Sequence, residues 1–146
     1  MNEIQRWLLT MQHFLTGDFI GIAMNVASAN QPKEIRWLYA IGNLNESYQT
    51  IRLQVNHGVA GIVWKTARLQ IDERIDGYPQ KMIDYPIARL EKLMSVVAAP
   101  VISQKQVSAV LLLGMRTPYK FTEKELRRLL IAAAQLAPKI EEYQND

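Results

Sequence analysis

Apolar residues recur every three or four positions along the first fifteen residues, which is the pattern of a helix with one buried face. The stripe consists of Ile4, Leu8, Met11 and Leu15, with Trp7 and Phe14 beside it. It ends before Gly17, so we predict an amphipathic helix over residues 2–15. The two aromatic side chains widen the stripe beyond what one sheet face needs, and we expect the terminal helices to offer a contact surface to a partner.

The pattern changes to a period of two after Phe19, which is typical of β-strands. Bulky and small side chains alternate over residues 19–28, and a second alternating run covers residues 34–41. Asn30-Gln31-Pro32 separates the runs and favours a turn, so we predict a hairpin. One face of its second strand is predicted to carry Ile35, Trp37, Tyr39 and Ile41.

Residues 53–66 predict a strand that passes directly into a helix. Leu53 and Val55 form a short β-type run, and Gly58 follows as a turn residue. The apolar spacing after the glycine predicts a helix over residues 59–66. The first N–H groups of such a helix have no intrahelical acceptor, and its first turn contains no Asp or Glu. This geometry suits a bound anion, although most helix N-termini meet only water.

A second helix start is predicted at Pro86. Residues 69–71 are a short strand candidate, and we expect a loop between them and Asp84-Tyr85-Pro86-Ile87. Proline suits the first position of a helix, and the residues after it have helical apolar spacing. The N–H of Ile87 would then be another donor without an intrahelical acceptor.

The last third of the chain predicts a second hairpin and a long helix. Residues 95–103 and 107–116 are rich in Val, Leu, Ile and Ala. In the second run both the odd and the even positions are apolar, so both faces of this strand should be buried and we expect helices on both faces of the sheet. Thr122-Glu123-Lys124-Glu125 is a capping box, with Phe121 and Leu126 placed as a hydrophobic staple. The helix is predicted to run to about Tyr143, with Pro138 bending its end.

Composition limits the classes of protein that this chain can represent. Its 146 residues, of which 49% are apolar, fit a single domain over residues 1–146. No apolar run approaches the roughly 18 residues of a membrane span, and the N-terminus lacks a signal-peptide pattern, so we expect a cytoplasmic protein without a membrane segment. The net charge is +3 with Lys and Arg spread singly, which disfavours nucleic-acid binding.

Candidate catalytic chemistry is sparse. The chain has no cysteine, which excludes disulfides, thiolate metal sites and cysteine nucleophiles. No paired carboxylates or metal-spaced clusters occur, so we predict no catalytic residue, no metal, no cofactor and no enzymatic activity. His57 is a candidate haem ligand or general base, but a lone histidine in a turn is usually solvated.

The order of the elements resembles that of GAF domains. The motifs that carry the resemblance are Gly58-Val59-Ala60-Gly61-Ile62-Val63, Ser95-Val96-Val97-Ala98-Ala99-Pro100-Val101 and Phe121-Thr122-Glu123-Lys124-Glu125-Leu126. The resemblance implies an α/β (α+β) fold with a six-stranded antiparallel sheet. It places the N- and C-terminal helices on one face and a ligand pocket on the other.

Within that family, three further motifs resemble the stand-alone nitrate receptors of bacterial nitrogen regulation. They are Gly17-Asp18-Phe19, Glu34-Ile35-Arg36-Trp37 and Tyr85-Pro86-Ile87. The resemblance implies that nitrate is held by the backbone amides of Val59, Ala60 and Ile87 and by Trp37, with Tyr85, Pro86 and Leu53 as the pocket wall. It also implies a sensor histidine kinase as partner, regulated by the nitrate-bound form, and a homodimer is a further expectation.

Other interpretations of the same residues stay open. By pattern alone, Trp37 and Tyr85 fit ordinary core packing. GAF domains also bind other ligands, such as cyclic nucleotides, or act only as dimerisation modules, so the fold does not fix the function. Free methionine sulfoxide reductases resemble this chain in architecture but work through cysteines, which are absent here.

Overall fold

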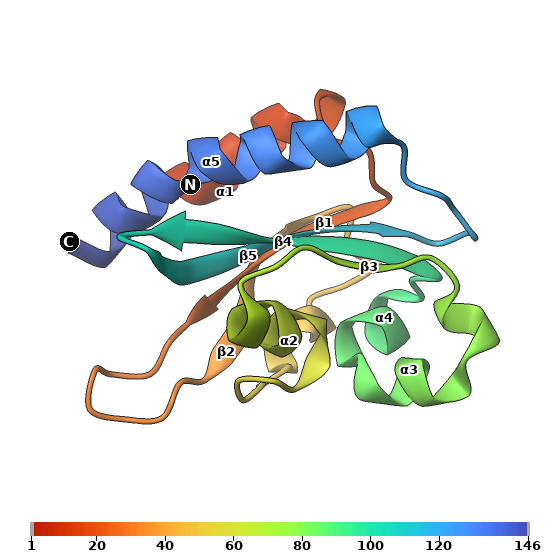
Figure 1. Cartoon of the computed structure of the whole chain (residues 1–146), viewed down its shortest axis with the longest axis horizontal. Helices are drawn as coiled ribbons and strands as arrows, with labels where there is room; N and C mark the ends of the chain where they lie inside the picture. Colours follow the sequence, from red (N-terminus) through yellow and green to blue (C-terminus); the bar gives the residue numbers. More distant parts are fainter. Residues whose placement is uncertain (1, 146) are drawn as a thin grey trace.

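The computed structural model describes residues 2–145. They form a central sheet with helices on both faces (Figure 1). The helices in chain order are α1 (Glu3–Thr10), α2 (Gly58–Thr66), α3 (Pro79–Asp84), α4 (Pro86–Glu91) and α5 (Glu123–Asn145). Short 3-10 helices are η1 (Met11–His13), η2 (Ser47–Thr50) and η3 (Ile75–Gly77). The strands are β1 (Phe19–Asn25), β2 (Ile35–Ile41), β3 (Gln70–Asp72), β4 (Ser95–Ser103) and β5 (Gln106–Met115).

The sheet has the order β2-β1-β5-β4-β3, and its neighbouring strands are antiparallel. Both predicted hairpins, β1–β2 and β4–β5, are present. The described residues form five strands, one fewer than the six that the resemblance to GAF domains implied. The run at Leu53 makes only a single bridge to Ile35, because Asn56 adopts a left-handed φ of 74° and turns the chain into α2.

A β-bulge in β2 corrects the predicted face of that strand. Ile22 pairs with Tyr39 and Ala23 with Trp37, so Leu38 has no residue opposite it on β1. The extra residue reverses the side-chain alternation. Ile35 and Trp37 therefore pack on one face of the sheet, whereas Tyr39 and Ile41 pack on the other.

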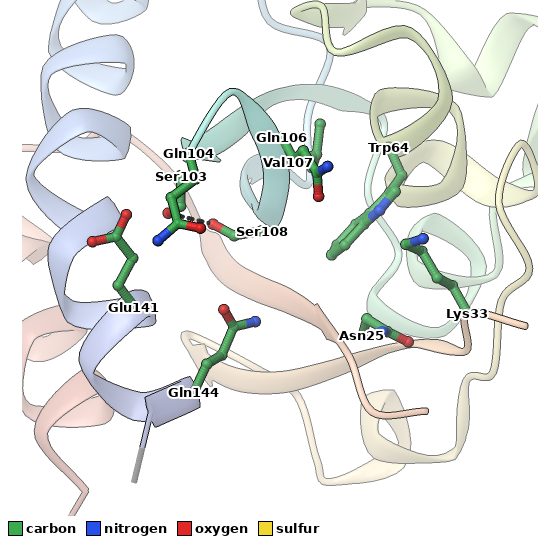
Figure 2. A pocket seen from close by; sticks show the side chains of 10 residues that line it. All are labelled: Asn25, Lys33, Trp64, Ser103, Gln104, Gln106, Val107, Ser108, Glu141 and Gln144. Atoms are coloured by element: carbon green, nitrogen blue, oxygen red, sulfur yellow. Dashed lines mark hydrogen bonds between the residues drawn. The ribbon is translucent and has the colours of Figure 1, made fainter. Parts of the chain in front are cut away.

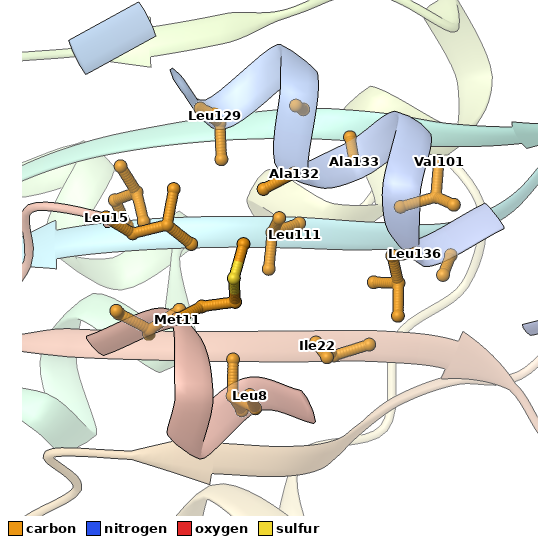
Figure 3. Close-up of a cluster of buried hydrophobic side chains, with 14 of the residues drawn as sticks. Leu8, Met11, Leu15, Ile22, Val101, Leu111, Leu129, Ala132, Ala133 and Leu136 are labelled. Atoms are coloured by element: carbon orange, nitrogen blue, oxygen red, sulfur yellow. The ribbon is translucent and has the colours of Figure 1, made fainter. Parts of the chain in front are cut away.

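The terminal helices α1 and α5 cover one face of the sheet (Figure 1). The side chains between them and the sheet form the terminal-helix core, in which Leu8, Ile22, Leu111 and Leu136 are fully or almost fully buried (Figure 3). The predicted capping box starts α5, since Thr122 Oγ1 accepts from Glu125 N at 3.1 Å and Glu125 Oε1 accepts from Thr122 N at 2.8 Å. The helix continues past Pro138 to Asn145.

The first helix is shorter and more deeply buried than predicted. The α-helical part ends at Thr10 and continues as the 3-10 turn η1. Trp7 belongs to the terminal-helix core with 9% of its surface exposed, and Phe14 packs partly against that core. The expectation that these aromatic residues form a contact surface is therefore wrong for Trp7. Within the described residues, the exposed large apolar side chains of the terminal helices are instead on α5, at Leu130, Ile131 and Tyr143.

Helices α2, α3 and α4 lie on the opposite face of the sheet (Figure 1). Their apolar residues, with those of η2 and the sheet, form the α2–α4 core. The two-sided burial predicted for β5 is confirmed, because Leu111 and Leu113 lie in the terminal-helix core while Val110 and Leu112 lie in the α2–α4 core. The helix start at Pro86 is also confirmed. The expected loop before it contains η3 and α3, and α3 has no buried residue.

Candidate functional site

Two glycines shape the turn that leads into α2. Gly58 has a left-handed φ of 67°, a conformation that costs other residues roughly 1 kcal/mol or more, and a Cβ there would lie 2.9 Å from Leu53 Cδ2. A Cβ on Gly61 would lie 2.5 Å from the carbonyl oxygen of Gln54. The turn is closed by Asn56 N, which donates to Gly61 O at 2.8 Å. The Gly-Val-Ala-Gly motif therefore packs the preceding turn directly against the first turn of α2.

The start of α2 presents uncapped backbone donors in a buried place. No side chain caps the helix, and its first turn contains no acidic residue. Val59 and Ala60 are 1% and 0% exposed, and within residues 2–145 neither N–H donates a hydrogen bond. The N–H of Ile87, which is 2% exposed at the start of α4, likewise has no acceptor in this part of the chain. Buried N–H groups without partners are rare in proteins.

The side chain of Trp37 adds a fourth unpaired donor. Trp37 is 1% exposed, and its Nε1 is buried without a hydrogen-bond partner in the described residues. Its ring packs over β1, where a Cβ on Gly21 would lie 3.2 Å from Trp37 Cε3. An unsatisfied buried donor costs about 1–3 kcal/mol, so a packing role alone leaves this indole N–H unexplained. The donor is accounted for if an acceptor binds next to it.

Tyr85 is held by a buried carboxylate that the sequence did not reveal. Its hydroxyl donates to Asp72 Oδ2 at 2.6 Å, and Gln70 Nε2 donates to the same oxygen at 3.2 Å. Lys81 Nζ is paired with the other oxygen, Asp72 Oδ1. Burial and the hydrogen bond to Asp72 raise the pKa of Tyr85, so its phenol stays neutral. Because its hydroxyl is already engaged, Tyr85 has only its ring and backbone left to border the candidate site.

Asp72 is ionised in this cluster. Burial alone would raise the pKa of its carboxyl, but hydrogen bonds from Lys81, Tyr85 and Gln70 outweigh that effect and lower the pKa. Asp72 belongs to β3, whereas Lys81 lies within α3 and Tyr85 directly follows it. The carboxylate thus ties the otherwise superficial α3 and the start of α4 to the edge of the sheet.

The structure brings six of the seven sequence-predicted residues into the α2–α4 core. These are Trp37, Leu53, Val59, Ala60, Tyr85 and Ile87. Pro86 is half-buried at the first position of α4. Leu53 packs on Gly58 and also lines a surface cavity of about 300 Å³ beside Glu34 and Arg52. The donors therefore come from three separate elements, β2, α2 and α4.

A buried ion pair, also missed from the sequence, fixes the far end of α4. Glu91 is 0% exposed, and its Oε1 accepts from Arg116 Nη2 at 2.7 Å and from Leu44 N at 2.9 Å. Arg116 also donates to the carbonyl oxygens of Glu91 and Gly42, each at 2.9 Å. A pattern of apolar spacing gives no signal for such a pair, because charged positions on a short helix are usually solvated.

Among residues 2–145, no helix is long and apolar enough to cross a membrane. In the same part of the chain, no three His, Asp or Glu side chains gather as a metal site would require.

No protein-family model and no curated protein sequence matches this chain. Solved structures do match it. A hypothetical protein from S. aureus superposes with a TM-score of 0.76 and 31% identity, covering 84% of this chain and 99% of its own. A Staphylococcus aureus NreA protein mutated in its nitrate-binding site superposes with a TM-score of 0.74 and 32% identity, covering 82% of this chain and 89% of its own.

A third match identifies the fold. The GAF domain of an Acinetobacter phosphoenolpyruvate-protein phosphotransferase superposes with a TM-score of 0.70 and 22% identity, over 88% of this chain and 73% of its own. The five-stranded antiparallel sheet with helices on both faces is thus a GAF fold. At 32% identity over most of both chains, the protein belongs to the NreA family of GAF-fold proteins.

More distant structures share the fold alone. They include a free methionine-R-sulfoxide reductase from Neisseria meningitidis, with a TM-score of 0.74 over 97% of this chain and 78% of its own. A domain of a Sinorhizobium meliloti two-component sensor histidine kinase superposes with a TM-score of 0.68 over 95% of this chain and 88% of its own. Each is 18% identical to this chain.

Proposed function

We propose that this protein is a nitrate sensor that binds the anion beside Trp37. The observation that carries the proposal is the buried indole N–H of Trp37, which has no acceptor within residues 2–145. The unpaired N–H groups of Val59, Ala60 and Ile87 support it, as do the NreA relatives, whose solved structures concern a nitrate-binding site. The proposed function is binding, without a catalytic residue, a metal or a cofactor.

The chemistry of nitrate suits these donors. Nitrate is planar and singly charged, and it is more weakly hydrated than sulfate or phosphate, so fewer hydrogen bonds replace the water that it loses. The starts of α2 and α4 both lack acidic side chains and add partial positive charge. Doubly charged anions lose far more hydration in a site walled by Leu53, Tyr85 and Pro86, so we expect them to be rejected.

A crystal structure with nitrate tests the position of the site. We expect flat trigonal density within hydrogen-bonding distance, about 3 Å, of Trp37 Nε1 and of at least one of the Val59, Ala60 and Ile87 nitrogens. Ordered nitrate elsewhere, with the Trp37 donor still unpaired, would place the site away from this cluster. Crystals grown with chloride are the matched control.

We propose that the partner regulated by nitrate binding is a cytoplasmic sensor histidine kinase. Nitrate can regulate a partner only if it binds one state of this protein more tightly than another. Leu130 and Ile131, each 49% exposed on α5, form the apolar surface that we propose for the kinase or for a second copy of this chain. The buried core of an interface is depleted of charged residues, and these two adjacent apolar side chains fit such a core.

Co-purification with the cognate kinase, with and without nitrate, tests this regulation. We expect nitrate to change the amount of kinase retained and Leu130→Ser with Ile131→Ser to abolish retention. Sedimentation of the same double variant reports on the homodimer. Kinase retention that is identical in both conditions would argue against regulation through this contact and leave dimerisation as the role of the surface.

A further inference from the structure

A second cavity lies at the end of the sheet that carries the β4–β5 turn, and it shares no residue with the Trp37 site (Figure 2). Its volume is about 250 Å³, small for a ligand cavity. Four parts of the chain line it: the end of β1 with the loop after it, the end of α2, the β4–β5 turn, and the C-terminal part of α5. The cavity is thus assembled from segments that are distant in sequence.

The β4–β5 turn beside this cavity is locally strained. Gln104 and Lys105 adopt left-handed φ values of 52° and 66°, where glycine or asparagine is the usual choice. Each such residue costs about 1 kcal/mol or more. Strand β5 also bulges, because Val101 pairs with Ala109 while Ile102 pairs with Val107. A bulge of this kind changes the direction of the side chains next to it.

The bulge places a pair of hydroxyl groups at the cavity wall. Ser108 is the bulged residue, and its Oγ lies 2.9 Å from Ser103 Oγ and donates to the carbonyl oxygen of Val101 at 3.2 Å. Figure 2 shows the two serines side by side at the turn, with the indole of Trp64 reaching toward the same space from α2. A hydroxyl pair and an aromatic plane therefore face one small cavity.

Most of the charged and amide side chains around the cavity are uncommitted, although Asn25 Oδ1 accepts hydrogen bonds from Ala27 N and Glu34 N. Lys33 and Glu141 form no ion pair within residues 2–145, and Gln104 and Gln106 make no side-chain hydrogen bond there. Figure 2 shows Lys33 beside Trp64 and Glu141 on the opposite side of the cavity. One positive and one negative group thus lie across from each other, with neutral donors and acceptors between them.

We propose that this cavity binds a small zwitterion of the size of a free amino acid. Lys33 pairs with its carboxylate, Glu141 pairs with its ammonium group, and its side chain lies against Trp64. A simple anion would satisfy Lys33 but face the like charge of Glu141, and a simple cation would face Lys33 in the same way. Nucleotides are too large for the cavity and carry only negative charge at the phosphate.

Nuclear magnetic resonance titration of the full chain with each free L-amino acid, at about 10 mM, tests the proposal. We expect at least one amino acid to shift the Trp64 indole N–H and the Gln106 amide in a saturable way. Acetate and ethylamine, which carry one charge each, should not saturate. Loss of one exposed charge pair corresponds to about fivefold weaker binding, so Lys33→Gln and Glu141→Gln should each weaken the response by that factor.

The matched controls are Lys105→Gln and Glu142→Gln, which remove exposed charges close by that do not line the cavity. Both should bind the amino acid as the unmodified protein does. The proposal is overturned if no amino acid gives saturable shifts, if acetate binds as tightly as any amino acid, or if the two cavity variants respond like the controls. The melting temperature of each variant confirms that it is folded.

Discussion

The hydroxyl of Tyr85 donates a 2.6 Å hydrogen bond to Asp72, which joins the start of α4 to the edge strand β3. The bond is buried and its acceptor is charged, and such bonds stabilise proteins by about 1.5–3 kcal/mol. Tyr85→Phe keeps the ring that borders the proposed site but removes this bond. We expect the free energy of unfolding in urea to fall by an amount in that range. Tyr78→Phe, at an exposed tyrosine nearby, should change it by less than about 0.5 kcal/mol.

The pKa of Asp72 gives a prediction for acid stability. Its folded-state pKa is lowered by the hydrogen bonds from Lys81, Tyr85 and Gln70, which outweigh the effect of burial. The carboxylate therefore contributes stability above its unfolded pKa of about 3.9, and this contribution is lost as the pH falls through the lower, folded-state value. We expect Asp72→Asn to be less stable than the unmodified protein at pH 7. The gap should narrow below about pH 4, and a gap that widens in acid would contradict the assignment.

Gly61 should tolerate no side chain. A Cβ there would lie 2.5 Å from Gln54 O and 3.1 Å from Asn56 N, and these backbone atoms cannot move aside as a flexible side chain can. Gly61→Ala should lower the free energy of unfolding by about 1–3 kcal/mol and weaken nitrate binding, because the turn before α2 must shift. At Gly77 a Cβ would meet nothing within 4 Å, so Gly77→Ala is the matched control. Equal stability of the two variants would show that the turn is not closely packed.

Local sequence signals account for much of the fold. The capping box at Thr122, the helix start at Pro86 and the two hairpins follow from residues that are neighbours in the sequence, and the structure confirms all of them. The bulge at Leu38 and the single bridge of Leu53 depend on how separate segments meet. A period-two pattern contains no information about such an inserted residue, and this is why the predicted face of β2 was wrong.

Part of the candidate site was likewise predictable from the sequence, and part of it was not. The resemblance to nitrate receptors pointed to Trp37 and the two helix starts, and the structure places them in one core. The partners of Asp72 and Glu91 were missed, because pairing between charged residues depends on tertiary contacts. Arg116 is 25 residues away from Glu91 in the chain.

Removing only one residue of the Glu91–Arg116 pair should strongly lower the free energy of unfolding. Arg116→Met leaves the fully buried Glu91 carboxylate without its counter-charge, which typically costs about 3–5 kcal/mol. We expect the double variant Arg116→Met with Glu91→Leu to recover part of that loss, because no buried charge then remains unpaired. A double-mutant cycle in urea measures the coupling. Additive effects of the two substitutions would mean that the pair does not hold α4 in place.

Calorimetry with nitrate tests the central claim most directly. The unmodified protein should give saturable heat with nitrate and a higher melting temperature, and chloride and a cyclic nucleotide, titrated alongside, should give neither. Trp37→Phe keeps an aromatic ring but removes the indole donor, and loss of a hydrogen bond to a charged ligand should weaken nitrate binding roughly ten- to 150-fold. Trp64→Phe, which alters a half-buried tryptophan outside the site, should bind nitrate normally. Equal nitrate affinity in Trp37→Phe and Trp64→Phe, or no response to nitrate beyond that to chloride, would contradict the account.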